Sequence, residues 1–502
     1  LDGQRFAGRD YLVHGRRRIT FSHHEQAVRA VAARLQMLGV GRGERVLLLG
    51  ANRPEWVVAF WATLSLGGVV VPGNSWWSEA ECHHAVATVE PVVTLADDRR
   101  RPLLPPATPT ATFDDLRPLV DRPGTGKLTL ATVDEDDPAI ILFTSGTTGR
   151  PKGATLSHRA VIAGQQNMLA LGGRFPPDIP LDAPSAVTLL TVPLFHLAGV
   201  QTLLITFLTG GRLVFLEGRF NAAEVLRLIE LEGVTRWGCV PTMMARVLDH
   251  PDLGRRRTET LRSITMGGAP VPPELVARTR AAFPRAKRGV GTTYGLTEAG
   301  GALTAGTGDA FAERPHSVGR ALPVVELRID SPVPDGAGEI LARAPHVMSG
   351  YWGQPDDPVL DRDGWLHTGD IGRIDHDGYL YVLDRCKDVV IRGGENVTGP
   401  HVEDHLLTHP DVSEAAVIGL PHPDLGEEVA AAVVVRPGSP VTAEALRAHA
   451  ASRLAHFEVP TRWWIRTEPL PTNAVGKVVK RQLRAQWPQA PQPTVPSIRG
   501  VQ

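Results

Sequence analysis

Residues 144–153 are the part of the chain best suited to chemistry, because they combine glycines, hydroxyls and a lysine. Glycines let a backbone turn tightly and approach a ligand, while hydroxyls and exposed N–H groups suit phosphate oxygens. The segment follows an apolar strand expected at 139–143, and it reads Thr144, Ser145, Gly146, Thr147, Thr148, Gly149, Arg150, Pro151, Lys152, Gly153. It predicts a polyphosphate-binding loop closed by a lysine. The alternative, a surface turn rich in Gly and Thr, is disfavoured by four hydroxyls within five positions.

This loop is not the standard nucleotide P-loop, which requires G-x-x-x-x-G-K-[ST]. The nearest match to that pattern, residues 121–128, lacks the first glycine and has Leu128 where the hydroxyl belongs. No strand leads into it, so Lys127 is expected to be an exposed loop residue.

The segment TSGTTGRPKG resembles the phosphate loop of the adenylate-forming (ANL) superfamily, which includes acyl- and aryl-CoA synthetases, luciferases and peptide-synthetase adenylation domains. Six further motifs follow in the family's order, and the resemblance covers roughly residues 11–484. They are PLFHLAG at 193–199, MGGAPVP at 266–272, TYGLTE at 293–298, GWLHTGD at 364–370, DRCKDVVIRGGEN at 384–396 and PTNAVGKVVKRQLR at 471–484.

The resemblance implies that a carboxylate attacks the α-phosphorus of ATP and expels pyrophosphate. Two anions must meet in this step, so the site has to neutralise charge and hold an in-line geometry. The residues from Thr144 to Lys152 would hold the departing phosphates. The remaining implied nucleotide ligands are Gly268, Ala269, Pro270 and Tyr294 for adenine with the neighbouring Thr293 and Gly295, Thr297 for the α-phosphate, and Asp370 with Arg385 for the ribose.

Three residues carry the implied catalytic roles. Lys477 would bridge the carboxylate and the α-phosphate, where a slim, mobile ammonium enters a crowded centre better than a planar guanidinium. Glu298, with Thr144, would hold Mg²⁺, since hard cations prefer oxygen ligands. His196 would lie near the acyl carboxylate, although a histidine in an apolar loop is often a core residue. His401, His405 and His409 have helical spacing, but no metal site is expected from them.

The resemblance also implies a second half-reaction with coenzyme A. Residues 384–389 match the family's hinge, with Lys387 at the pivot, and Gly393 and Gly394 would line a tunnel for the pantetheine arm. One departure concerns this tunnel. Where the family usually has Tyr or Ser, Pro, a variable residue and Glu, this chain has Thr398, Gly399, Pro400 and His401.

The elements that must position these residues form an α/β fold. The length of 502 residues predicts more than one domain. We expect an N-terminal adenylation domain (1–384) with doubly wound mixed or parallel sheets and a small antiparallel, β-barrel-like subdomain. A smaller, mobile α+β domain (385–502) would follow. Strands are expected at 45–49, 69–71, 92–96, 139–143, 213–216, 415–418 and 429–435, helices at 54–66, 78–86, 222–232, 402–407 and 443–454, antiparallel strands at 363–382, and a surface excursion at 102–123.

Composition narrows the partners. A net charge of −1 argues against nucleic acid. Cys82, Cys239 and Cys386 form neither a disulfide framework nor a zinc pattern, and no secretory signal is visible, so a cytoplasmic setting is expected. The apolar stretches 56–78 and 183–211 are broken by Gly and Pro, so they predict buried helix–turn–strand units instead of membrane spans. Peripheral membrane contact stays open, as does a monomer or a homodimer.

The prediction is an ATP-, Mg²⁺- and CoA-dependent acyl-CoA synthetase acting on a small carboxylic acid, with a medium- or long-chain fatty acid favoured. No aspartate for an amino group occurs at 188–199. The expected acyl pocket is lined by Trp237, Gly238, Val240, Gly268, Thr292 and Thr293. Three alternatives remain: an acyl-AMP ligase loading a carrier protein, an aryl-acid–CoA ligase, and a non-catalytic nucleotide-binding homologue.

Overall fold

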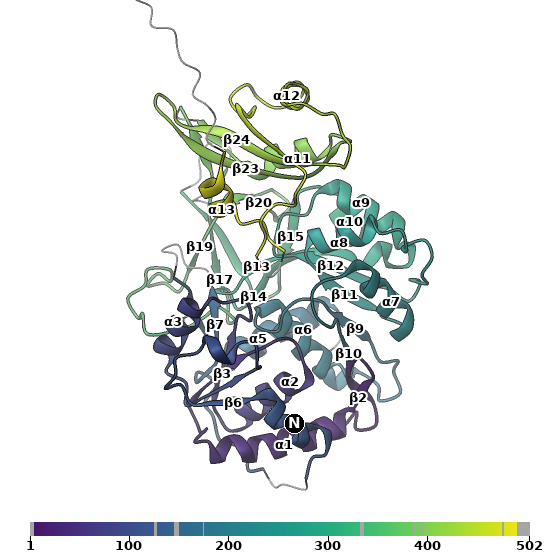
Figure 1. Ribbon diagram of the computed structural model, residues 1–502, viewed down its shortest axis with the longest axis vertical. Helices are drawn as coiled ribbons and strands as arrows, with labels where there is room; N and C mark the ends of the chain where they lie inside the picture. Colours follow the sequence, from purple (N-terminus) through teal and green to yellow (C-terminus); the bar gives the residue numbers. More distant parts are fainter. Residues whose placement is uncertain are drawn as a thin grey trace, which may run out of the picture. The chain divides into compact units, whose positions relative to one another are not determined.

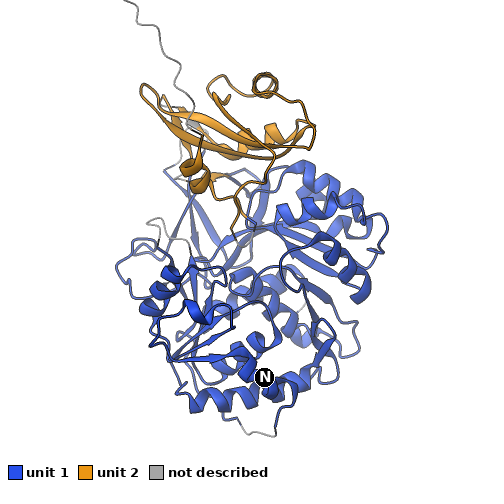
Figure 2. Ribbon diagram, viewed as in Figure 1, with its two compact units in different colours: residues 1–382, 474–476 blue, residues 383–473, 477–502 orange. Residues whose placement is uncertain are grey.

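The computed structural model describes residues 5–124, 128–144, 150–173, 175–331, 336–385, 388–393, 395–473 and 476–488. The chain divides into two compact units (Figure 2). The first comprises Leu1–Val382 and Ala474–Gly476, and the second comprises Leu383–Asn473 and Lys477–Gln502. The first unit is a mixed α/β domain with two large sheets, and the second is a smaller α+β domain.

The larger sheet of the first unit has 13 strands. Its centre is parallel from β1 to β13, and its other half is antiparallel. The antiparallel strands therefore continue the main sheet at its edge. In order the strands are β16 (Glu326–Asp330), β17 (Gly338–Arg343), β19 (Leu366–Ile374), β20 (Tyr379–Arg385), β15 (Ser317–Ala321), β14 (Gly301–Thr307), β13 (Val290–Leu296), β12 (Ser263–Gly267), β11 (Arg236–Cys239), β9 (Val187–Leu190), β10 (Arg212–Phe215), β1 (Asp10–His14) and β2 (Arg17–Thr20).

The second sheet of this unit has seven strands, with parallel pairing from β7 to β6 and antiparallel pairing of β7, β8 and β18. In order they are β18 (Gly350–Tyr351), β8 (Lys152–Ser157), β7 (Pro138–Thr144), β4 (Val69–Gly73), β3 (Arg45–Leu49), β5 (Val93–Ala96) and β6 (Thr110–Thr112). The helices of the unit are α1 (Phe21–Met37), α2 (Pro54–Ser65), α3 (Glu79–Val89), η1 (Arg101–Leu103), α4 (Phe113–Asp121), α5 (His158–Leu171), η2 (Pro176–Asp178), α6 (Leu197–Leu208), α7 (Ala222–Glu232), α8 (Pro241–Leu248), α9 (Pro273–Ala282), η3 (Pro284–Gly289) and α10 (Gly308–Glu313).

Helices cover both faces of the large sheet (Figure 1). On one face α7, α8 and α9 pack on the sheet through a core that includes Trp237 and Met266. On the other face α5 and α6 contribute to a core that reaches both sheets and includes Leu190 and Ile140. Side chains of successive strand residues alternate between these two faces, which decides what each residue can line.

Local sequence explains where several helices begin. Ser78 and Glu81 form a reciprocal capping box at the start of α3, and Asn221 caps α7, which ends at the left-handed Gly233. The apolar stretches 56–78 and 183–211 fold as helix and strand units, with α2 and α6 each 12 residues long. Within the described part of the chain, no helix is long and apolar enough to cross a membrane.

The predicted surface excursion at 102–123 is wrong. It contains β6, which pairs with β5, and α4, which packs against α1 and α2. Thr112 and Asp115 form a capping box at the start of α4, and Phe113, Leu116 and Val120 are buried. Proline in a helix removes a hydrogen bond, but burial of three apolar side chains offsets that loss at Pro118.

The second unit contains a five-stranded sheet in which β21, β22, β23 and β24 pair antiparallel and β25 joins β24 in parallel. Its elements are β21 (Val390–Arg392), β22 (Glu395–Val397), α11 (Gly399–Leu407), β23 (Val412–His422), β24 (Gly426–Val435), α12 (Ala443–Ala451), β25 (Arg462–Arg466) and α13 (Lys480–Gln486).

Candidate active site

The carboxyl ends of β9, β11, β12 and β13 bring most of the predicted residues of the first unit to one edge of the large sheet. Ligands of open α/β sheets bind at this edge. His196 follows β9, Val240 follows β11, and Gly268, Ala269 and Pro270 follow β12. Thr293, Tyr294 and Gly295 lie at the end of β13, where Thr293 pairs with Gly267 of β12.

Tyr294 and Asp370 meet although 76 positions separate them. The Tyr294 hydroxyl donates to Oδ2 of Asp370 at 2.8 Å. Asp370 lies in β19, is only 4% exposed, and has a neighbouring hydroxyl in Thr368, which accepts from the Asp370 N–H. The structure therefore joins a residue predicted at adenine to one predicted at the ribose.

The hairpin formed by β7 and β8 places Thr144 directly opposite Lys152. Ser145, Gly146, Thr147, Thr148 and Gly149, which the sequence assigns to phosphate binding, lie outside the described residues. The Lys152 ammonium is 2.5 Å from Oδ2 of Asp357, and both side chains are mostly buried.

Glu298 lies in the turn between β13 and β14, and its Oε1 accepts a hydrogen bond of 2.9 Å from the Tyr351 hydroxyl. Burial and the adjacent Glu298 carboxylate raise the pKa of the Tyr351 phenol, so the hydroxyl keeps its proton. The nearby Thr144 hydroxyl has the opposite, smaller effect on this pKa. The sequence analysis missed Tyr351 and Asp357, for which the only signal was an aromatic pair followed by two aspartates at 351–357.

His196 is the residue directly before α6, whose N-terminus it does not cap through its side chain, and burial lowers the pKa of its imidazole to about 4. The ring is therefore neutral near pH 7. Its Nε2 is buried and has no hydrogen-bond partner among the described residues. Buried nitrogens normally have a hydrogen-bond partner, so an unpaired one at the carboxyl edge of the sheet is consistent with a residue that contacts a ligand.

Two predicted pocket residues lie on the face of the large sheet that packs against α7, α8 and α9. Trp237 is 1% exposed, lies in the core under α7 and α8, and donates its indole N–H to Thr191 at 3.0 Å. Thr292 pairs with Met266 and so faces the same side. Strand alternation therefore places Trp237 and Thr292 on the face opposite to Gly238, and their role in an acyl pocket stays a prediction.

The second unit holds Arg385, Gly393 and Lys477. Arg385 ends β20, and Gly393 has a positive φ of 59° and donates its N–H to the Leu425 carbonyl. The backbone N–H of Lys477 donates to Oδ1 of Asn473 at 3.0 Å. Gly394 and the expected pivot Lys387 lie outside the described residues.

The departure from the family at Gly399 has a structural account. The Gly399 N–H donates to Oδ2 of Asp384 at 2.8 Å, a bond that a proline at this position would lack. Asp384 is buried, and burial raises the pKa of its carboxyl. Lys480 lies beside Asp384 and forms an ion pair of 2.8 Å with Glu403. Burial disfavours the charged ammonium of Lys480, but the carboxylates of Glu403 and Asp384 raise its pKa.

The three histidines at helical spacing have other contacts. His405 stacks on His449 with ring centroids 4.6 Å apart, and His409 meets the same ring edge-on. Among the described residues, no group of three or more His, Cys, Asp or Glu side chains is arranged to hold a metal ion.

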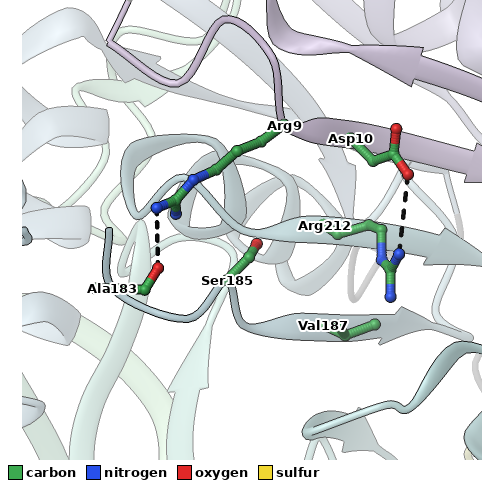
Figure 3. Close-up of a pocket in the computed structure, with 6 residues that line it drawn as sticks. All are labelled: Arg9, Asp10, Ala183, Ser185, Val187 and Arg212. Atoms are coloured by element: carbon green, nitrogen blue, oxygen red, sulfur yellow. Dashed lines mark hydrogen bonds and ion pairs between the residues drawn. The ribbon is translucent and has the colours of Figure 1, made fainter. Parts of the chain in front are cut away.

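A cavity of about 300 Å³ lies at the amino ends of β1, β9 and β10, away from the predicted residues (Figure 3). Arg9 donates to the Ala183 carbonyl at 2.9 Å, and Arg212 lies 3.8 Å from Asp10. None of the predicted site residues lines it; its walls are Arg9, Asp10, Ala183, Ser185, Val187 and Arg212.

Comparison with known proteins decides the family. Residues 2–352 match the family described as AMP-binding enzyme, and residues 401–477 match the AMP-binding enzyme C-terminal domain. The chain belongs to the AMP-binding enzyme family. This AMP-binding enzyme is an AMP-forming acid–thiol ligase of the acyl-CoA synthetase type, which uses ATP and coenzyme A.

The relatives of this AMP-binding enzyme are named for different carboxylic acids. A feruloyl-CoA synthase of an Amycolatopsis species is 35% identical, covering 94% of this chain and 95% of that protein. A long-chain-fatty-acid–CoA ligase of Mycobacterium tuberculosis is 31% identical, covering 94% and 93%. The crystal structure of ATP-bound MatB from Rhodopseudomonas palustris is similar with a TM-score of 0.85 and 29% identity, covering 96% of this chain and 98% of that one.

Proposed function

We propose that this enzyme converts a medium- or long-chain fatty acid to its acyl-adenylate with release of pyrophosphate, and then to the acyl-CoA thioester. The observation that carries the choice of acid is open space beside Gly238. A Cβ built on Gly238 meets no heavy atom within 4 Å, although the residue lies in a central strand. Gly238 pairs with Leu190 and Thr265, so this space is on the face toward α5 and α6.

The space lies at the carboxyl end of β11, on the sheet edge where His196 and the nucleotide residues gather. An extended alkyl chain would enter it with its carboxylate at that edge. Each buried methylene contributes about 0.8 kcal/mol, so the extent of this space would set the preferred chain length.

At the polyphosphate end, the residues fit Mg²⁺. The Glu298 carboxylate and the Thr144 hydroxyl are hard oxygen ligands, and the Tyr351 hydroxyl donates a hydrogen bond to that carboxylate. When bound, the ion would offset phosphate charge. Lys152 would meet the departing phosphates, and Asp370 with Tyr294 would orient the nucleoside.

In the first step, the Lys477 ammonium would neutralise the negative charge where the carboxylate meets the α-phosphate. In the second step, Gly393 and Gly394 would leave room for the CoA thiol to reach the acyl-adenylate. We expect the second unit to move between these steps about a hinge near 384–389.

A second candidate, an aryl-acid–CoA ligase, is favoured by the feruloyl-CoA synthase at 35% identity. AMP formation should be measured for acids from acetate to C18 and for cinnamic-type acids, with and without CoA. The proposal expects activity to rise with alkyl length and to require CoA for turnover. A response to aryl acids alone would replace the fatty-acid assignment with the second candidate.

The same assay tests Lys477. Lys477→Ala should abolish acid-dependent pyrophosphate release and spare thioester formation from supplied acyl-adenylate, because the ammonium acts only in the first step. If pyrophosphate release stays intact, the catalytic assignment of Lys477 fails.

A further inference from the structure

One segment, residues 348–357, joins two parts of the expected polyphosphate site and is called the clip here. Its backbone is fixed to the turn that carries Glu298 and to β8, which begins at Lys152. The N–H groups of Met348, Ser349 and Trp352 donate to the carbonyls of Glu298, Thr155 and Gly153 at 2.9, 2.9 and 2.7 Å.

Two side chains of the clip hold the two charged residues of that site. The Tyr351 hydroxyl donates to Oε1 of Glu298 at 2.9 Å. The Asp357 carboxylate pairs with Lys152 at 2.5 Å, where the two side chains are 13% and 20% exposed. The Lys152 ammonium also lies 4.8 Å from the centroid of the Tyr351 ring. Tyr351 therefore contacts both charged residues, one through its hydroxyl and one through its ring.

These contacts restrict the side-chain conformations of Glu298 and Lys152 before any nucleotide binds. A free glutamate or lysine loses rotamer freedom when it binds a ligand, at a cost of up to about 2 kcal/mol. Side chains already held by a hydrogen bond and a buried ion pair have lost that freedom on folding. Pre-organised charges also need no reorganisation during the reaction.

We propose that Tyr351 and Asp357 are positioning residues for adenylation, Tyr351 acting through Glu298 and Asp357 acting through Lys152. This inference rests on the proposed function, since it takes Glu298 as the magnesium residue and Lys152 as a phosphate residue. It adds two residues from one chain segment that neither touch the acid nor bind the nucleotide directly.

Binding of ATP tests the inference without an acid, so that no acid is adenylated. ATP affinity is measured calorimetrically over a range of Mg²⁺ concentrations. Tyr351→Phe keeps the ring over Lys152 and removes only the hydroxyl. A hydrogen bond to a carboxylate accounts for about tenfold in an equilibrium constant, so the Mg²⁺ concentration for half-maximal ATP binding should rise about tenfold. Affinity for ATP without Mg²⁺ should stay unchanged.

Asp357→Asn tests the other contact. Lys152 then loses its charged partner, so ATP affinity should fall about tenfold with or without Mg²⁺, while the Mg²⁺ requirement stays as in the wild type. If Asp357→Asn instead tightens ATP binding, the carboxylate merely repels phosphate, and its positioning role is refuted.

A double-mutant cycle separates positioning from a general structural effect. In a Glu298→Gln background, Tyr351→Phe should leave the Mg²⁺ requirement unchanged, because its route through the carboxylate is gone. An equal shift in both backgrounds would overturn the role of Tyr351. Tyr381→Phe is the matched control, since the Tyr381 hydroxyl donates to Asp375 at 3.3 Å in the exposed hairpin of β19 and β20.

Failure of the proposed function and failure of the clip inference give different results. If none of the tested acids supports AMP formation by the wild-type enzyme, the proposed function fails. The ATP and Mg²⁺ titrations would still report on the clip. If AMP forms normally and neither variant changes ATP or Mg²⁺ binding, the clip inference fails alone.

Discussion

Enlarging Gly238 should shorten the range of acids that the enzyme accepts. A Cβ at this position meets no atom within 4 Å, so a new side chain enters open space and the strand tolerates it. An alanine methyl would displace about one methylene of the acyl chain, worth about 0.8 kcal/mol or about fourfold in kcat/KM. Leucine adds four carbon atoms, so it should cost about 3 kcal/mol, on the order of a hundredfold, for any acid long enough to reach it.

The assay is pyrophosphate release for acids from C2 to C18, reported as kcat/KM for each length. Gly238→Ala and Gly238→Leu should leave acetate and butyrate unchanged and progressively suppress longer acids. The matched control is Gly254→Ala, which also enters open space but lies in an exposed turn. An equal loss for all acids, or no loss for any, would refute the placement of the acyl chain beside Gly238.

Two further predictions concern stability. His24 of α1 is buried between Tyr11 and Phe207, and burial lowers the pKa of its imidazole to about 3. Between pH 6.5 and that value the unfolded state binds a proton that native His24 does not, so the free energy of unfolding falls as pH falls, by about 2 kcal/mol from pH 6.5 to 5. His24→Phe should flatten this dependence in urea titrations; an unchanged slope for His24→Phe contradicts the assignment. Gly399→Pro removes the N–H that Asp384 accepts and should destabilise the second unit by about 1–3 kcal/mol, seen as faster hydrogen exchange in β23 and β24. Gly399→Ala keeps that N–H and should cost less, since its Cβ would approach the end of the Lys480 side chain at 2.7 Å but would lie at ordinary contact distance from Val417 and Glu403. Equal protection in the proline variant would rule out the account of Gly399.

Local patterns predicted many elements well. The helix expected at 222–232 is α7 with the same bounds, because Asn221 and Gly233 mark its ends and its apolar spacing is helical. The strand expected at 45–49 is β3. The error at 102–123 arose from counting prolines, since burial of Phe113, Leu116 and Val120 against α1 and α2 outweighs them.

Motifs in the sequence by themselves indicated the family, which the comparisons confirm, and predicted the residues of the candidate site. Their types and order reflect chemistry that acts over a few positions: glycines for close approach, hydroxyls for phosphate, and a carboxylate for a cation. Nucleotide and metal roles for Glu298, Asp370 and Lys477 remain predictions from that resemblance.

Only the tertiary structure decided which side chains share a face and which residues hold others in place. Trp237 and Gly238 are adjacent in sequence, yet strand alternation buries the first under α7 and α8 and opens the second to the opposite face. Asp357 meets Lys152 across 205 positions, a contact set by the pairing of β18 with β8. Pairing between strands is a long-range property, because it depends on loop closure and on packing of the whole domain, and no local pattern encodes it.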